Sequence, residues 1–169
     1  MKRLFVAIAL TFVTAGCSNL GKTFETSPFV STTVIEVAEA FSMNSFVTYE
    51  PYEELVDEEK QRAKTAFSKP DFSRIPKNGY LTVKMSTGDI DSASSNFWRV
   101  VIKDTDGNVI LNETGEPGVA DYTIVNGVTS WHNLFVVVAP ENLKPPFEAF
   151  VIYEPSNYRW GFRITENRK

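Results

Sequence analysis

The sequence has little of the chemistry from which catalytic and metal sites are usually built. It contains one cysteine and one histidine among 169 residues. A lone cysteine cannot form a disulfide within the chain, and these two residues cannot supply the four ligands of a structural zinc site. The sequence also lacks a glycine-rich phosphate loop. We therefore expect no cofactor, and we favour a protein that binds over one that catalyses.

Positive charge is also scarce. The chain carries 17 basic and 21 acidic residues, and two of the basic ones, Lys2 and Arg3, lie at its extreme amino terminus. Nucleic-acid-binding domains carry basic patches that neutralise phosphates. The acidic balance argues against a nucleic-acid partner, and also against electrostatic docking of the domain on anionic lipid.

The amino terminus carries an apolar run that is too short to span a bilayer. Lys2 and Arg3 precede residues 4–13, which are apolar except for Thr11, and three small residues follow. A membrane-spanning helix needs roughly 20 apolar residues, about twice this length. A basic start, a short apolar run and small residues in this order predict a secretory signal.

The small residues lead directly to the only cysteine, and the segment Thr14-Ala15-Gly16-Cys17 resembles the lipobox of bacterial lipoproteins. Thr14 stands where that pattern usually has Leu. The resemblance implies cleavage before Cys17, acylation of its thiol with palmitate-type chains, and attachment to a membrane. An Asp after the cysteine resembles an inner-membrane retention signal. Ser18 at that position implies the outer membrane, on either its periplasmic or its surface face.

These features divide the chain into three parts. We expect a signal peptide over residues 1–16, a lipidated cysteine and flexible tether over 17–28, and a single domain over 29–169. The domain is rich in aromatic and β-branched residues, which favour strands. Alternating segments separated by turn signals such as Asn126-Gly127 predict nine strands. They are Phe29 to Phe41, Phe46 to Tyr49, Tyr80 to Ser86, Phe97 to Lys103, Val109 to Asn112, Tyr122 to Val125, Leu134 to Ala139, Phe147 to Glu154 and Tyr158 to Thr165.

The fold class that follows is mainly β. Turn signals every ~8–12 residues are typical of an antiparallel β-sandwich, and the run of strands resembles immunoglobulin-like sandwiches in general. Leu134 to Ala139 is continuously apolar, which is typical of a strand covered on both faces.

One amphipathic helix interrupts the strands. Pro51 suits its start, Pro70 ends it, acidic residues precede basic ones, and this order complements the helix dipole. Its apolar stripe is expected to pack on the sandwich. The stripe consists of Tyr52, Leu55, Val56, Ala63, Ala66 and Phe67.

Two features suggest catalysis weakly. Ser130 lies two residues before His132, the only histidine, but a triad needs a third group, and a partly buried structural histidine is the simpler interpretation. Glu59 falls inside the helix stripe, where a second carboxylate would make a hydrolytic pair. A salt bridge from Glu59 to Arg62, or to an arginine on a facing strand, is the simpler interpretation.

Two loops suggest calcium. Asp104, Asp106 and Asn108 resemble the start of an EF-hand loop, but Val109 and Gly115 stand where that loop needs Gly and Glu. In an alternative geometry Asp89 and Asp91 would join Asp104 and Asp106 at one end, as in calcium-dependent phospholipid-binding sandwiches. Plain hairpin turns also explain these residues.

Aromatic residues beside loops supply the remaining candidate contacts. They are Trp131, His132, Tyr158 and Trp160. Exposed aromatics suit a protein or envelope-glycan partner, whereas buried ones serve the core. The sequence thus predicts a lipid-anchored, non-catalytic binding or structural module. A calcium- or carbohydrate-binding module and a carboxylate-dependent hydrolase remain the alternatives.

Overall fold

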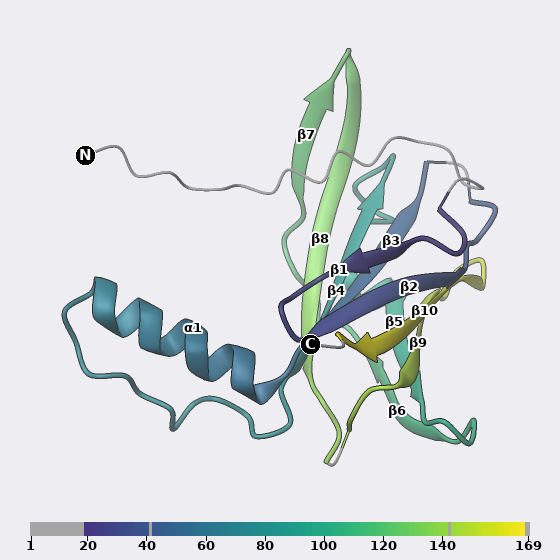
Figure 1. The fold of residues 1–169 in the computed structure, drawn as a ribbon. Helices are drawn as coiled ribbons and strands as arrows, with labels where there is room; N and C mark the ends of the chain where they lie inside the picture. The colour runs from purple at the N-terminus through teal and green to yellow at the C-terminus, as the bar shows by residue number, and fades with distance from the viewer. Residues whose placement is uncertain (1–18, 41, 142, 168–169) are drawn as a thin grey trace.

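The computed structural model describes residues 19–40, 42–141 and 143–167. Two antiparallel sheets face each other and enclose one apolar core (Figure 1). The six-stranded sheet has the order β1-β2-β10-β9-β5-β6, and the four-stranded sheet has the order β3-β4-β8-β7. The strands are β1 Thr23–Glu25, β2 Val30–Glu36, β3 Asn44–Glu50, β4 Tyr80–Thr87, β5 Trp98–Lys103, β6 Val109–Thr114, β7 Asp121–Val125, β8 Val128–Val138, β9 Phe147–Tyr153 and β10 Tyr158–Glu166. The helix α1 spans Tyr52–Thr65, and the 3-10 turn η1 spans Ser95–Phe97.

The predicted fold class is confirmed: a mainly β sandwich with one helix. The alternation of apolar residues places one face of each strand in the core. Aromatic rings join the two sheets, since Phe46 on β3 meets Phe162 on β10 at 5.5 Å and Tyr49 on β3 meets Phe147 on β9 at 5.4 Å. Such edge-to-face pairs fix the sheets against each other.

The structure corrects the predicted tether. Thr23–Glu25 forms β1, an edge strand paired with β2. The chain is tied down even earlier, because the Gly21 amide donates to the carbonyl of Val34 at 2.7 Å. The segment escaped prediction because three residues between turns carry too little pattern to indicate a strand.

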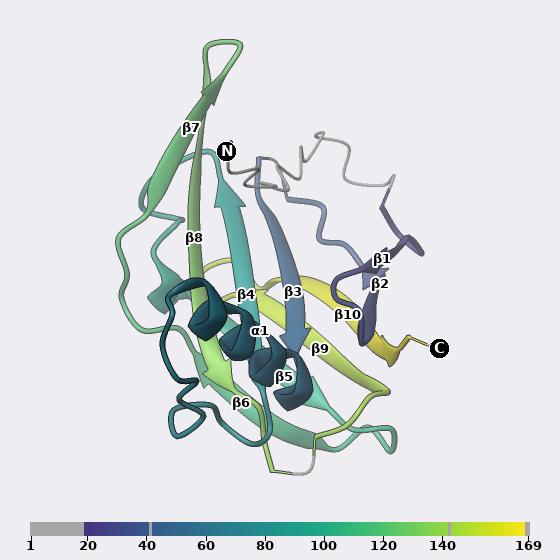
Figure 2. The same ribbon diagram turned by 60° about the vertical axis from the view of Figure 1, so that its left-hand side comes forward.

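The predicted packing of the helix on the sandwich is wrong. Figures 1 and 2 show α1 leaving the end of β3 and projecting away from both sheets, with the chain returning alongside it to β4. Residues 66–79, the return segment, lie against the helix: the Asp71 amide donates to Glu59 Oε1 at 2.7 Å, and Ala63 is buried. We call α1 and the return segment the arm.

The prediction that the Leu134 to Ala139 strand is covered on both faces is also wrong. Phe135 and Val137 face the core, whereas Leu134, Val136 and Val138 are about half exposed on the outer face. A short apolar run does not distinguish a strand buried on both faces from one with an uncovered apolar face. Among the described residues, no helix is long and apolar enough to cross a membrane.

Candidate functional site

The predicted contact residues do not form one site. Trp131 and His132 lie on β8 of the four-stranded sheet, whereas Tyr158 and Trp160 lie on β10 of the other sheet. Trp160 is buried in the core beside Trp98, with ring centroids 5.4 Å apart, and is therefore unavailable to a partner. Cys17 lies outside the described residues, so its lipidation remains a prediction.

His132 takes part in a row of hydroxyl contacts on the outer face of the four-stranded sheet. Its Nε2 lies 2.8 Å from Thr123 Oγ1, while Ser130 Oγ lies 2.8 Å from Ser86 Oγ. Ser130 therefore pairs with another serine and not with the imidazole. These bonds link β7, β8 and β4 side by side, which is a structural role and not a nucleophile–base arrangement.

The four loop aspartates do not converge. Asp89 and Asp91 precede β5, near whose start Trp98 Nε1 donates to the Ser92 carbonyl, whereas Asp104 and Asp106 follow its end. A six-residue strand keeps the two pairs about 20 Å apart, so the calcium geometry is wrong. Asp104 caps its own turn and accepts from the amides of Asp106 and Asn108 at 2.9 and 2.8 Å.

Hydrogen bonds favour the ionised form of the Asp104 carboxyl group. Bonds from the Asn108 side chain and backbone hold the pKa of its carboxyl below its usual value, which favours the charged, accepting form. The described part of the chain holds no group of three or more metal-ligating side chains placed for an ion.

Glu59 forms the predicted salt bridge. Its carboxylate receives Arg62 Nε at 2.6 Å and Nη2 at 2.7 Å, besides the Asp71 amide. The bond from Arg62, followed by that from Asp71, lowers the pKa of Glu59. A carboxylate held ionised by a guanidinium is unsuited to act as a general acid. Its role is to fasten the return segment to α1.

An exposed apolar hairpin is a feature that was not predicted from the sequence. The β7–β8 hairpin extends beyond the other strands (Figure 1). Its exposed fractions are 55% for Tyr122, 62% for Ile124, 65% for Val125 and 69% for Val128. Apolar side chains continue up to the Asn126-Gly127 turn. A solvated hairpin tip usually carries polar residues, so this apolar stretch could have indicated a contact surface.

The two faces of the hairpin carry different residues. Tyr122 lies opposite Trp131 with ring centroids 5.2 Å apart, and Ile124 follows on the same face, which continues the core-facing side of the sheet. Further along the outer face of β8 stand Leu134, Val136 and Val138. This row lies on the opposite face of the sheet from Tyr122 and Ile124, and we call the hairpin alone the β7–β8 surface. It is concentrated on one edge of the molecule, which is typical of a partner site.

The edge of β7 is also open. It is the last strand of its sheet, and within the described ranges no strand pairs with its outer side. Of its five residues only the first, Asp121, is charged. The edge strand β6 of the other sheet has a register shift opposite Ile102/Lys103 and carries Glu113, and β1 is only three residues long. Bulges, charges and short length protect edges from pairing, and β7 has less of this protection.

A second surface feature is a shallow depression over the six-stranded sheet. Its charged lining includes Glu36, Arg99 and Arg159. Arg159 Nε bonds Glu36 at 2.8 Å, and Arg99 bonds Glu154. Glu39 is a second carboxylate in the lining, and Glu36 is held by Arg159.

Comparisons with known proteins leave the chain without an assigned relative. No family model matches the sequence, and no curated protein or solved structure is significantly similar to it. The function is therefore inferred from the chain's own features.

Proposed function

We propose that the protein is an exported lipoprotein, anchored through an acylated Cys17, whose sandwich acts by binding a protein partner and not by catalysis. The anchor is supported by the basic start, the short apolar run and the Thr14-Ala15-Gly16-Cys17 segment. Acyl chains on that cysteine attach the chain to the outer membrane of the cell envelope.

The fold supports a short connection to such an anchor. Lys22 donates its amide to the Asn19 carbonyl at 3.0 Å in a turn, and the Gly21 amide is bonded to β2. Four residue steps from Cys17 to Gly21 span at most about 14 Å when extended. An acylated Cys17 would therefore hold the domain close to the headgroups.

The observation that carries the binding role is the β7–β8 surface. It combines exposed apolar side chains with an unpaired strand edge. An extended segment of a partner protein would continue the sheet beyond β7 through main-chain hydrogen bonds, and its side chains would cover Tyr122 and Ile124. Main-chain pairing supplies affinity, and the apolar contacts on alternate residues supply specificity.

Fractionation of cells tests the anchor. The wild-type protein is expected in the outer membrane, and Cys17→Ser in the soluble envelope fraction or unprocessed. Ser18→Asp is the matched variant, since it keeps the lipid and is expected to retain the protein in the inner membrane. A Cys17→Ser protein that is processed normally and remains in the outer membrane contradicts the anchor.

Site-specific photo-crosslinking in cells tests the surface. A photoreactive residue in place of Ile124 is expected to give a discrete adduct that protease digests. The matched control is Ile110, an exposed isoleucine on the β6 edge of the other sheet, which is expected to give none. Equal labelling at both positions contradicts the site. An adduct that resists protease but yields to glycan-cleaving enzymes assigns the surface to an envelope glycan.

A further inference from the structure

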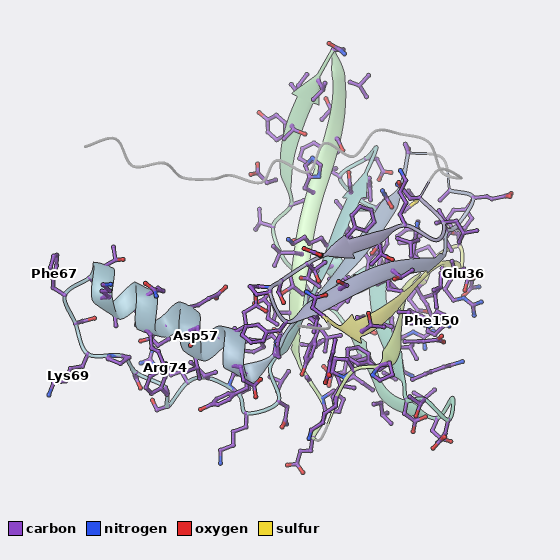
Figure 3. The ribbon with its side chains drawn as sticks, viewed as in Figure 1. Glu36, Asp57, Phe67, Lys69, Arg74 and Phe150 are labelled. Carbon is purple, nitrogen blue, oxygen red and sulfur yellow. The ribbon has the colours of Figure 1, made fainter. Side chains whose placement is uncertain are left out.

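The tip of the arm presents an aromatic side chain entirely to solvent. Phe67 follows α1 directly, and its exposed fraction is 99%. Figure 3 shows Phe67 and Lys69 at the far end of the arm, both pointing outward. Burial of a phenylalanine ring contributes stability to a fold. Phe67 contributes none of this to the fold.

The backbone at Phe67 is also unfavourable for its residue type. The Ser68 amide donates to the Ala63 carbonyl at 2.9 Å and the Phe67 amide to that of Lys64, the pair of bonds that ends a helix in a Schellman motif. The motif places Phe67 at φ 51°, in the left-handed region where glycine is usual. A bulky residue there costs free energy that local packing does not return, and such strain is found where a side chain serves function.

The charge around Phe67 is one-sided although the whole chain is acidic. Residues 60–70 contain four basic residues and no acidic one. The four are Lys60, Arg62, Lys64 and Lys69, of which Lys60 is paired with Asp57 and Arg62 with Glu59. The helix dipole accounts for basic residues in the last turn of α1, namely Arg62 and Lys64. It accounts neither for Lys69, which lies beyond the helix, nor for Phe67.

We propose that the tip of the arm docks on an anionic phospholipid surface. Phe67 inserts into the boundary between headgroups and acyl chains, and Lys64 and Lys69 contact the lipid phosphates. An apolar residue flanked by lysines at the end of a projecting element matches such a surface in both polarity and charge. The domain as a whole is acidic, but the structure places Lys64, in the last turn of α1, and Lys69 together at the tip of the arm (Figure 3). The proposal does not depend on acylation of Cys17.

An environment-sensitive fluorophore at position 67 tests the insertion. In the full chain, Cys17→Ser removes the only native thiol, so Phe67→Cys then carries the one label. Vesicles of phosphatidylcholine mixed with phosphatidylglycerol are expected to shift the emission to the blue, whereas vesicles of phosphatidylcholine alone are expected to shift it much less. Since Phe67 packs on nothing, the substitution leaves the fold intact. The same label at Thr105, in the exposed β5–β6 turn, is the matched control and is expected to stay unchanged.

The lysines supply a second, quantitative measurement. A basic residue near an anionic surface is worth about 1 kcal/mol, or about fivefold in an equilibrium constant. Adding Lys64→Gln and Lys69→Gln to the labelled chain is therefore expected to lower the ratio of inserted to water-exposed probe about 30-fold. Circular dichroism checks that the variants are folded.

Two results would overturn the proposal. One is an emission at position 67 that mixed vesicles change no more than they change the emission at position 105. The other is a blue shift that appears without vesicles and grows with protein concentration, because that result assigns the tip to a second copy of the chain. Neither result bears on the anchor, which the fractionation of Cys17→Ser tests separately.

Discussion

The outer faces of the two sheets carry different kinds of side chain. On the six-stranded sheet, charged side chains pair across strands: Arg163 bonds Glu148 at 2.7 Å and Arg159 bonds Glu36 at 2.8 Å. The outward ring of Phe150 is flanked by cations, with Lys103 Nζ and Arg159 Cζ each 5.3 Å from its centroid. Figure 3 shows Glu36 and Phe150 on this side of the molecule. This face is built to remain in water.

Ion pairs of this kind are not found on the described part of the four-stranded sheet. Among the described residues its strands hold no ion pair, and Leu134, Val136 and Val138 stand about half exposed. Both sheets bury equally apolar inner faces, so the core does not require the difference. Paired charges add little stability at a surface, but they keep it solvated and monomeric. The difference between the two sheets therefore lies in their outer faces.

The largest expected effect is on the free energy of unfolding. It comes from substituting two adjacent valines on β8 that lie on opposite faces of the strand. Val137 faces the core and is 6% exposed, whereas Val136 faces outward and is 49% exposed. Val137→Asp buries a carboxylate without a partner and is expected to cost several kcal/mol, a large share of a domain's stability. Val136→Asp is expected to cost about 1 kcal/mol or less. Urea unfolding of both variants checks this.

The valine pair also tests the partner surface. Val136→Asp is expected to leave the domain folded and the crosslink at Ile124 unchanged, because Val136 lies on the opposite face of the sheet from Ile124. If the two substitutions destabilised the domain equally, β8 would be covered on both faces in solution, and the comparison between the sheets would fail.

Gly161 on β10 allows a test of how closely the outer face of the six-stranded sheet is packed. A Cβ there would lie 2.9 Å from the Glu36 Cβ and 3.0 Å from the Phe150 Cε1, so the glycine makes room for the ring. Gly161→Ala is expected to cost about 1–3 kcal/mol through overpacking. Adding Phe150→Leu removes the contact with the ring but not that with Glu36, and is expected to restore part of the loss, which a double-mutant cycle measures. Purely additive losses would contradict this account.

The fold was predictable from the sequence because alternation is a local signal. The strands from β2 to β10 were expected, most of them because they carry apolar residues two apart between turn residues. β8 was expected from its continuous apolar run, and it begins at Val128 and not at Leu134. The position of the arm was not predictable. The stripe through Ala63 indicates that one face of α1 is covered, but periodicity does not say by what, and here the cover is the chain that follows the helix. The β7–β8 surface was missed for the same reason, because exposure depends on where the facing sheet ends.

A smaller effect on stability is expected from pH, through Glu54 at the base of the arm. Burial raises the pKa of Glu54, a bond with Ser27 partly offsets this, and Glu58 and Glu50 raise it further. A raised folded-state pKa means that the folded protein binds more protons than the unfolded chain. Stability from this group is therefore greatest below its unfolded pKa and falls as pH rises through the folded value.

Glu54→Gln is accordingly expected to raise the Tm slightly near pH 7 and to have no effect in acid below the usual range of glutamate. Glu53→Gln, on the exposed side of the same turn, is the matched control and is expected to leave the Tm unchanged. Thermal scans across pH measure both. A Glu54→Gln variant that was less stable near pH 7 would mean that its carboxylate forms a net favourable contact.

Calcium gives the smallest expected effect, which is none. On the six-stranded sheet Glu36, Glu148 and Glu154 form ion pairs, and Asp89 and Asp104 cap their own turns. The strand β5 holds Asp89 and Asp91 away from Asp104 and Asp106. Millimolar calcium is therefore expected to leave the Tm unchanged. A bound ion at 100 times its Kd would add about 2.7 kcal/mol, which a thermal scan resolves. A rise in Tm that Asp104→Asn abolished would contradict this expectation. It would mean that the loops at the two ends of β5 meet and form a calcium site.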